Sequence, residues 1–382
     1  MIYLDNAATT KMFREALDSY IEVNEKFYGN TASINNYGKN NAKLLDASRR
    51  QIADILKVEQ EKIYFTAGAT ESNNIAILGA AKHKKAFGNR IIVSKIEHPS
   101  VLETFRALEK EGFVLDYVSV DKMGRVDLVD LKRLLTKDTI LLSVMQVNNV
   151  FGTIQPIAEI IEVLKDYPKV HFHVDGVQGV IKEEIDLSLI DSYSASAHKF
   201  HGPKGIGILY VKSRRTVNNV NYGGGQEDNL RSGTINLPSI VSMAKAMRLY
   251  SERIEEIKER HSVFKERIIN ELGSLKYLEI NSPKDENFVD SIINISLPKI
   301  KGEAIINSLN EENVMVSTTS ACSSKKFSVN EALYARGLSE ENIKGSIRIS
   351  LSYFTTSEDI DGFIKVFKDK YKQFEEVIES AI

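Results

Sequence analysis

The chain of 382 residues contains one cysteine, no tryptophan and only seven prolines. One cysteine cannot form an intramolecular disulfide, so the sequence favours a reducing compartment, and we expect a cytoplasmic protein. No apolar run approaches the roughly 20 residues needed to span a bilayer, and the N-terminal MIYLDNAATT has no apolar signal core. The formal net charge of −2 gives no overall attraction for nucleic acid or an anionic membrane. We therefore expect neither direct nucleic-acid binding nor membrane association.

Residues 62–211 alternate between short apolar segments and amphipathic segments. Runs such as KIYFT (62–66), RIIVS and TILLSVMQV lack strict polar alternation, which is typical of parallel strands covered by helices on both faces. The segments SYSAS (192–196) and GIGILYV (205–211) are too close together for a parallel crossover. The fold class is therefore α/β, with one antiparallel strand expected near the end of the sheet.

The pattern changes beyond this sheet region. Apolar residues at three- and four-residue spacing from Pro238 to Leu272 predict one long helix, which Gly273 would end. SIINISL, a helical segment near 302–312, SIRISLS and a final amphipathic helix then predict a small α/β unit. The expected organisation is a large domain over residues 13–255 and a small domain formed by residues 1–12 and 256–382.

The segment SASAHKFHGPKGIG places Lys199 in a turn that follows a strand. In open α/β sheets, ligands bind beyond the carboxyl ends of the strands. A lysine withdrawn from water near other cations has a lowered pKa and can form a Schiff base. The alternative, from spacing alone, is an ordinary surface lysine in a loop.

In the segment FTAGATESNN, a strand ends in a tight turn and a helix begins near Thr70. The backbone N–H groups of such a helix start, together with the Thr70 hydroxyl, can bind a phosphate. The alternative is a routine turn in which Thr70 caps the helix.

The segment HFHVDGVQG carries His171, His173 and Asp175 at alternating positions, so the three side chains share one face of a strand. Two histidines and a carboxylate can bind a metal ion. Alternatively, Asp175 pairs with a protonated ring nitrogen, as in enzymes that use pyridoxal 5'-phosphate (PLP), with Gln178 close behind it. In that case the two histidines pack beneath helices.

Three further segments carry candidate contacts to an anion or a cofactor. In KIEHPSV, His98 precedes a helix that opens with proline, where it can stack on a planar cofactor or simply cap the helix. In YGGGQEDNLRSGTIN, Arg231 and Thr234 could reach an anion, although a surface Ω-loop has the same composition. In SIRIS, Arg348 could bind a carboxylate or be an edge-strand charge, and the flanking isoleucines point into a core.

The only cysteine, Cys322, lies in VSTTSACSSKKFSVNE, among small hydroxyl residues and lysines. A free structural cysteine usually behaves as a small buried hydrophobe, whereas this segment is polar. Neighbouring lysines lower the pKa of a thiol and favour the nucleophilic thiolate. The residues therefore indicate a reactive thiol.

Taken in order, these segments resemble the PLP-dependent cysteine desulfurases, the NifS/IscS-like group I proteins of the class V aminotransferases. The resemblance covers essentially the whole chain, from YLDNAATT through GATESNN, EHPSV, VNNVFGTIQPI, HVDGVQG, SAHKFHGPKGIG, GGGQE and RSGTIN to SACSS and SIRIS. It implies the PLP-dependent transferase fold type I, with a mostly parallel seven-stranded sheet in the large domain. It also implies a homodimer with shared active sites.

The resemblance implies a role for each matching residue. Lys199 would bind PLP covalently and, with His98 and Cys322, carry out catalysis. Asp175 would pair with the pyridine nitrogen and Gln178 with the ring hydroxyl, while His98 would stack on the ring. The phosphate would be bound by the Ala69 backbone, Thr70, Ser196 and His198.

The resemblance also implies a substrate. Asn149 would contact the cofactor and, with Arg348, bind the carboxylate of L-cysteine. Thr234 would reach the phosphate bound in the other subunit. Cys322 matches the sulfur-accepting cysteine, so the expected products are L-alanine and a persulfide on Cys322. The persulfide would pass to an acceptor protein for iron–sulfur cluster assembly or for thiolation of tRNA or a cofactor.

Other interpretations stay open at this point. A selenocysteine lyase or a class V aminotransferase would share the fold, and an aminotransferase has no need of Cys322. A non-catalytic assembly partner is a further alternative, against which the presence of Lys199 and Cys322 argues. A metallohydrolase would use His171, His173 and Asp175.

Several positions depart from the family pattern. Val150 stands where glutamate is frequent, and Asn35 lies where histidine is frequent. Gly176 and Gly179 stand where alanine is usual. We expect Val150 and Asn35 to alter substrate approach or rate.

Overall fold

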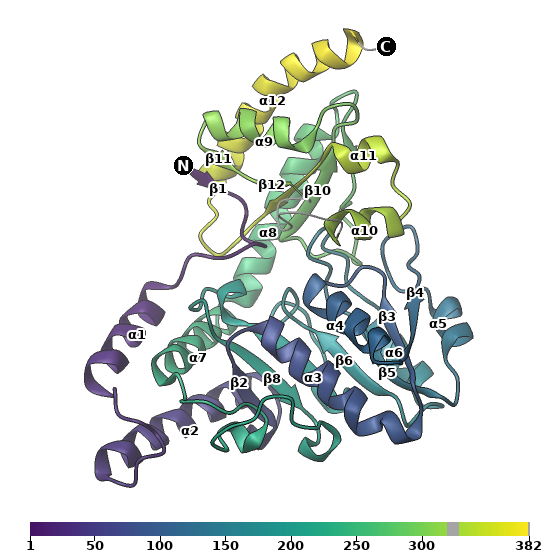
Figure 1. Cartoon of the computed structure of the whole chain (residues 1–382). Coiled ribbons are helices and arrows are strands. Elements are labelled where there is room, and N and C mark those ends of the chain that lie inside the picture. The colour runs from purple at the N-terminus through teal and green to yellow at the C-terminus, as the bar shows by residue number, and fades with distance from the viewer. Residues whose placement is uncertain (319–327, 381–382) are drawn as a thin grey trace.

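The computed structural model describes residues 1–318 and 328–380 of the chain. Figure 1 shows a large unit, formed by a seven-stranded sheet with helices α1 to α7, and a small unit above it. The N-terminal strand lies in the small unit, whereas the helix that follows it packs on the large one. Within the described residues, no helix is long and apolar enough to cross a membrane.

The large unit is built on a sheet of order β2-β8-β7-β6-β5-β3-β4. Its strands are β2 (Ile63–Thr66), β3 (Arg90–Ser94), β4 (Val114–Val118), β5 (Thr139–Ser143), β6 (His171–Asp175), β7 (Ser192–Ser196) and β8 (Gly207–Val211). Strands β3, β4, β5, β6 and β7 run parallel to one another, whereas β8 is antiparallel to both of its neighbours, β7 and β2. The predicted mostly parallel sheet with one antiparallel strand near its end is therefore confirmed.

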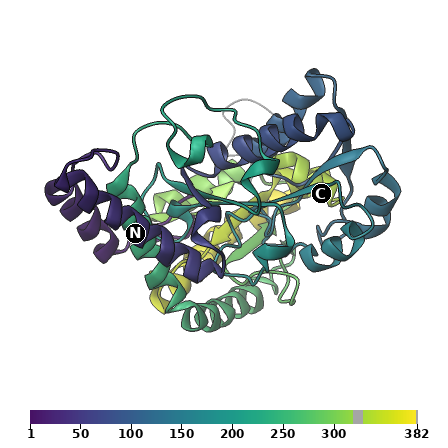
Figure 2. The same ribbon diagram turned by 90° about the horizontal axis from the view of Figure 1, so that it is seen from below.

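Helices cover both faces of this sheet (Figure 2). They are α1 (Arg14–Lys26), α2 (Asn36–Leu56), α3 (Ala69–Lys84), α4 (Pro99–Lys110), α5 (Leu128–Leu134), α6 (Ile157–Leu164) and α7 (Leu237–Ser251). One core joins Phe172 and Val174 to Ile240 and Met243 of α7, and another, on the opposite face, contains Val93 with residues of α3 and α4. Burial on both faces explains why these strands are apolar without alternation.

The small unit contains a sheet of order β12-β13-β10-β9 and a short parallel pair, β1-β11. Its strands are β1 (Ile2–Tyr3), β9 (Glu279–Ile280), β10 (Ile292–Ser296), β11 (Val314–Met315), β12 (Ser317–Thr318) and β13 (Ser346–Ser350). Its helices are α8 (Ile254–Leu272), α9 (Gly302–Glu311), α10 (Ser328–Ala335), α11 (Glu340–Lys344) and α12 (Ser357–Ser380). Its core joins Phe264 of α8 to Ile347, Ile349 and Phe363. The domain boundaries drawn from the sequence stay a prediction.

Short 3-10 turns connect several of these elements. They are η1 (Gln60–Lys62), η2 (Lys85–Phe87), η3 (Leu187–Leu189), η4 (Ala197–Lys199), η5 (Arg214–Thr216) and η6 (Glu227–Asn229). The turn η4 directly follows β7, so Lys199 stands just beyond the carboxyl end of a central strand.

The single helix predicted from Pro238 to Leu272 is wrong, because the segment forms two helices, α7 and α8. The backbone leaves helical geometry at Arg253, whose guanidinium lies over the rings of Phe13 and Tyr353. α7 packs on α1 and α2, whereas α8 packs on α12. The break therefore directs the chain from the core of the large unit to the core of the small unit. The apolar spacing continues across the break, so the sequence pattern does not reveal it.

Candidate active site

A cavity of about 960 Å³ lies where the carboxyl ends of β5, β6 and β7 meet the small unit. Parallel strands end at the same edge of a sheet, which brings residues far apart in the sequence together there. The cavity is lined by ten of the residues predicted from the sequence: Ala69, Thr70, His98, Asn149, Asp175, Gln178, Ser196, His198, Lys199 and Arg348.

Lys199 is held at the cavity wall by the N-terminal segment. Its Nζ donates hydrogen bonds to the carbonyl oxygens of Ala7 at 2.5 Å and Ala8 at 2.9 Å. The Gln178 amide donates to the same Ala7 oxygen at 3.0 Å. Sequence reasoning missed the two alanines as contacts, although the motif YLDNAATT that contains them was a signal.

The start of α3 presents backbone donors to the cavity. The first N–H groups of a helix have no acceptor within the helix, and here the N-cap residue Gly68 supplies no side-chain cap. Gly68 has a φ of 149°, a conformation that favours glycine and lets β2 turn directly into α3. Because Ala69, Thr70 and Ser196 line the same cavity, this helix start is suited to bind a phosphate.

His198 lies beside this helix start. Its Nδ1 is 3.2 Å from the Thr9 hydroxyl, and burial, together with the charges of Lys199 and Lys204, lowers the pKa of His198 to about 4. The imidazole is therefore neutral near pH 7, and it can still donate one hydrogen bond to an anion.

Asp175 is buried at the end of β6, with 4% of its surface exposed. One carboxylate oxygen accepts from the Asn73 amide at 2.9 Å, and the other accepts from the Val177 N–H at 3.0 Å. These donors are neutral, so the carboxylate can also accept a hydrogen bond from a protonated ring nitrogen in the cavity. Sequence reasoning missed Asn73, which lies a hundred positions away from the strand that it supports.

His98 caps a helix, and its stacking on a cofactor stays a prediction. It is the N-cap residue of α4, where its Nδ1 accepts from the Ser100 N–H at 3.1 Å, and it also lines the cavity. His98 is exposed at the mouth of the cavity, but partial desolvation by the protein atoms around its ring lowers its pKa. The charge of Asp175 opposes this shift and that of Lys199 adds to it.

Glu97, the residue before His98, is a buried carboxyl group that sequence reasoning missed. It is 3% exposed, and its Oε1 accepts from the Met145 N–H at 2.6 Å. Burial, reinforced by the charge of Asp175, raises the pKa of Glu97 well above its ordinary value, so the neutral form is favoured. Only its place in the motif EHPSV could have drawn attention to it.

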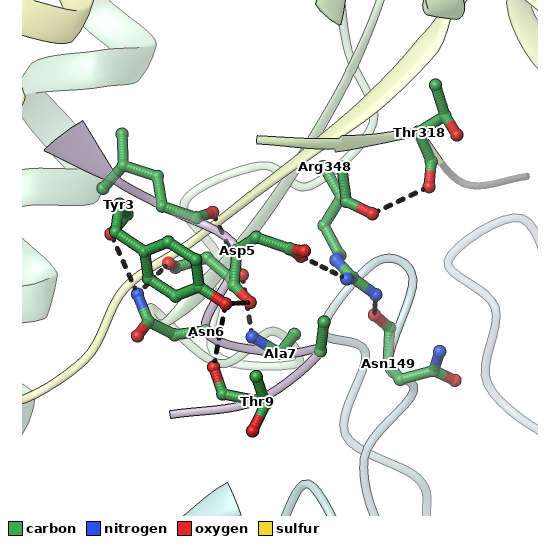
Figure 3. A network of polar contacts seen from close by, with 12 residues as sticks. Tyr3, Asp5, Asn6, Ala7, Thr9, Asn149, Thr318 and Arg348 are labelled. Carbon is green, nitrogen blue, oxygen red and sulfur yellow. Dashed lines mark hydrogen bonds and ion pairs between the residues drawn. The ribbon is translucent and has the colours of Figure 1, made fainter. Parts of the chain in front are cut away.

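Arg348 lies on β13 with its guanidinium at the cavity (Figure 3). Its Nη2 pairs with the Asp5 carboxylate at 2.8 Å, and its Nη1 donates to the carbonyl oxygen of Asn149 at 2.9 Å. The flanking Ile347 and Ile349 are fully buried in the core of the small unit. A guanidinium fixed from both sides is suited to bind a carboxylate, and Asp5 is a contact that the sequence did not reveal.

His171 and His173 are packed inside the sheet and, in the described part of the chain, lie outside the cavity lining. Both rings contact the Ser192 hydroxyl, at 2.8 and 2.9 Å, and burial lowers the pKa of each to about 3. No group of three His, Cys, Asp or Glu side chains among the described residues is placed to hold a metal ion. The geometry therefore favours the packed interpretation of these histidines.

Thr234 is the one predicted site residue within residues 1–318 and 328–380 that does not line the cavity, and it is exposed. Cys322 lies outside the described residues. The departures Asn35 and Val150 have structural roles. Asn35 caps α2 by accepting from the Gly38 N–H at 2.8 Å, and Val150 is 3% exposed in an apolar cluster.

Gly176 and Gly179 stand where the family usually has alanine, and two large neighbours explain the difference. A Cβ on Gly176 would lie 1.8 Å from the Tyr193 ring, and one on Gly179 would lie 2.3 Å from the Gln146 amide oxygen. The Tyr193 hydroxyl donates to that same oxygen at 2.7 Å. This pair fills the space in which two alanine methyl groups would otherwise lie.

The family model described as Aminotransferase class-V matches residues 2–363. The chain belongs to the class-V aminotransferase family. A NifS/IcsS protein homolog of Lactobacillus delbrueckii subsp. bulgaricus is 46% identical over 380 residues, covering 99% of both chains. Cysteine desulfurase IscS of Dictyoglomus turgidum is 39% identical over 370 residues, which are 96% of this chain and 93% of that protein. A solved NifS-like protein is similar with a TM-score of 0.91 and 35% identity, covering 97% and 99% of the two chains.

Class-V aminotransferases of this NifS/IscS type are PLP-dependent, and the predicted family and fold class are confirmed. The cavity fits PLP on its own geometry. It offers a lysine amine for the aldehyde, a buried carboxylate with neutral neighbours for the ring nitrogen, and an uncapped helix start for the phosphate.

Proposed function

We propose that this protein is a cysteine desulfurase that removes sulfur from L-cysteine and releases L-alanine. The observation that carries the proposal is the convergence of Lys199, Asp175 and Arg348 on one cavity with the uncapped start of α3. The cysteine desulfurase of Dictyoglomus turgidum, similar over almost its full length, supports the same conclusion.

Two groups of residues hold PLP in this proposal. Lys199, which now donates to the carbonyls of Ala7 and Ala8, would bind the cofactor aldehyde covalently, Asp175 would pair with the ring nitrogen, and Gln178 would contact the ring hydroxyl. The phosphate is bound by the Ala69 backbone, Thr70, Ser196 and His198. When bound, PLP supplies an electron sink for the charge that develops on the substrate α-carbon.

Arg348 binds and orients the substrate carboxylate. Its two existing contacts, with Asp5 and the Asn149 carbonyl, fix the plane of the guanidinium and reduce the side-chain entropy lost on binding. Lys199 then acts as the base that takes the proton from the α-carbon, and neutral His98 can exchange a proton at the edge of the same cavity.

Cys322 accepts the sulfur. Its thiolate attacks the substrate sulfur, so a sulfur–sulfur bond forms and the bond from Cβ to sulfur breaks. The electron pair of the broken bond stays on the substrate Cβ, which takes up a proton, and the α-carbon regains the proton that Lys199 removed, so that alanine is formed. The persulfide on Cys322 then passes its outer sulfur to an acceptor protein, in the cytoplasm, for iron–sulfur cluster assembly or for thiolation of tRNA or a cofactor.

The active form in this proposal is a homodimer in which Thr234 reaches the phosphate bound by the other subunit. Thr234 is exposed, and so are several large apolar side chains that a second copy could cover. Among them are Tyr28 at 76%, Ile34 at 90% and Tyr222 at 83%.

The test combines product analysis with mass spectrometry of the intact protein. Wild type with PLP and L-cysteine should form alanine and carry one extra sulfur, Lys199→Ala should form neither product, and Cys322→Ser should bind PLP but gain no sulfur. Alanine from L-selenocysteine alone would indicate a selenocysteine lyase. A keto acid product insensitive to Cys322→Ser would indicate an aminotransferase, and a protein that fails to bind PLP would contradict the proposal outright.

A further inference from the structure

A line of buried polar side chains runs behind Asp175, on the side away from the cavity. His171 Nε2 lies 2.8 Å from the Ser192 hydroxyl, which lies 2.9 Å from His173 Nδ1. His173 Nε2 lies 2.9 Å from the Asn73 Oδ1, and the Asn73 amide donates to Asp175 at 2.9 Å. Asp175 is 4% exposed and the other four residues are fully buried.

The direction of each hydrogen bond follows from its two ends. The Asp175 carboxylate only accepts, so Asn73 turns its NH₂ toward it and its oxygen toward His173. His173 therefore carries its proton on Nε2, and because the buried ring is neutral, Nδ1 accepts from Ser192. The Ser192 oxygen in turn accepts from Nε2–H of His171. Every donor in the line therefore points toward Asp175.

Asn73 also connects this line to His98. Its second amide hydrogen points to the Ser100 hydroxyl at 2.9 Å, and that hydroxyl lies 2.8 Å from His98 Nδ1. Ser194 donates to the Asn73 oxygen at 2.5 Å and so fixes the orientation of the amide. Because His98 Nδ1 accepts from Ser100, its Nε2 is the nitrogen that carries the proton.

Several titratable groups face Asp175 and the two ends of the line. Glu97 before α4 and Tyr193 on β7 face Asp175, and burial raises the pKa of both well above their ordinary values. Lys199 and His98 face it from the cavity, as their mutual electrostatic influence indicates. At the far end, the cationic end of α3 faces His171 with His83 and Lys84.

We propose that His171 and His173 are positioning residues that act through Asn73 to keep the Asp175 carboxylate charged and His98 in one tautomer. Hydrogen bonds to the charged form of a buried carboxylate stabilise that form, and each donor in a chain polarises the next. This inference rests on the proposed function, in which Asp175 keeps the ring nitrogen of PLP protonated. Without the line, that nitrogen loses its proton at a lower pH.

A matched pair of substitutions tests the line. Ser192→Ala removes the hydroxyl that joins the two histidines, whereas Ser143→Ala removes a hydroxyl from the strand on the other side of His173. Both serines are fully buried, and the Ser143 hydroxyl has no hydrogen-bond partner among the described residues. The two variants therefore remove the same volume at equally buried positions, but only Ser192→Ala interrupts the line of hydrogen bonds.

The measurements are the dissociation constant of PLP from the reconstituted protein and the protonation of its isotope-labelled ring nitrogen by NMR across pH. Ser192→Ala should weaken PLP binding about 2- to 10-fold, which corresponds to the loss of one hydrogen bond. It should also move the titration of the PLP ring nitrogen to lower pH. Ser143→Ala should change neither. His173→Leu should exceed the effect of Ser192→Ala, and His173→Gln, which keeps a donor toward Asn73, should recover much of it.

Thermal unfolding of the PLP-free variants separates loss of folding from loss of the line. Equal PLP affinity and equal nitrogen titration in folded Ser192→Ala and Ser143→Ala would overturn the inference while leaving the proposed function intact. Failure of the wild type to bind PLP would instead overturn the proposed function, so the two failures are distinguishable.

Discussion

Replacing Glu227 by alanine should destabilise the large unit far more than an ordinary surface ion pair would predict. The Glu227 side chain is 2% exposed, and it binds both terminal nitrogens of Arg49, at 2.6 and 2.9 Å. It also accepts from the Phe65 N–H at 2.8 Å, which satisfies the outer edge of strand β2. The Arg49 guanidinium lies 4.5 Å from the centre of the Phe65 ring.

The magnitude follows from what Glu227→Ala leaves behind. Breaking a buried pair costs about 3–5 kcal/mol because the remaining charge is uncompensated. Arg49 is 16% exposed and can regain some water, which favours the lower end, about 3 kcal/mol. For a domain of about 150–250 residues, 1 kcal/mol lowers Tm by roughly 2–4 °C, so a fall of at least about 6 °C is expected.

Scanning calorimetry on the variant and on Glu252→Ala measures this difference. Glu252 pairs with Arg248 at the same 2.6 Å, but the two side chains are 50% and 38% exposed, so its loss should cost less than about 1 kcal/mol. Arg49→Met combined with Glu227→Met should recover part of the stability, since no charge is left unpaired. Equal Tm values for Glu227→Ala and Glu252→Ala would refute the reasoning.

Three further substitutions have expected outcomes. Arg348→Lys should raise KM for cysteine about tenfold or more, because the point charge of a lysine cannot reproduce the hydrogen bonds of the guanidinium, each worth about 1.5–3 kcal/mol. An unchanged KM in steady-state kinetics would contradict this expectation. Lys265 is fully buried, and burial lowers its pKa from 10.5 to about 8. Between these two values the unfolded chain binds a proton that the folded chain lacks, so wild-type stability rises with pH relative to Lys265→Met. Parallel Tm curves of the two proteins from pH 7 to 10 would exclude that shift. Gly68→Ala should weaken PLP binding and lower Tm, because a φ of 149° strains any other residue by about 1–3 kcal/mol. Space does not limit this substitution, since a Cβ there would lie 3.7 Å from the Ser196 hydroxyl. A PLP dissociation constant equal to that of wild type would show that the turn tolerates a side chain.

The sequence predicted the parts of the site that depend on strand ends. Lys199 and Thr70 follow recognisable strands and Asp175 ends one, and parallel strands end at one edge, so the pattern made a shared site possible, while the resemblance to the family gave each residue its expected role. Arg348 was predictable for a related reason, because the alternation in SIRIS separates one polar side chain from its buried neighbours.

Contacts between distant segments could not be predicted in this way. No spacing rule connects His173 to Asn73, since the hydrogen bond depends on how α3 lies across the sheet. The break between α7 and α8 was missed because apolar periodicity reports which face is buried, not which core buries it. The role proposed for Thr234 requires a second subunit, and Cys322 lies outside the described residues, so both roles stay proposals.

The N-terminal segment has a consequence for how the protein is made. Asn6 and Ala7 bond to Ser350, more than 340 positions later, and β1 pairs with β11. The ribosome adds roughly 5–20 residues per second, so the first residues wait on the order of tens of seconds for these partners. Ala7 and Ala8, whose carbonyls accept from Lys199, stand in the same segment, so this segment has all of its contacts only after Ser350 and β11 have been synthesised. A nascent chain whose large sheet has already folded would therefore still lack part of the wall behind Lys199.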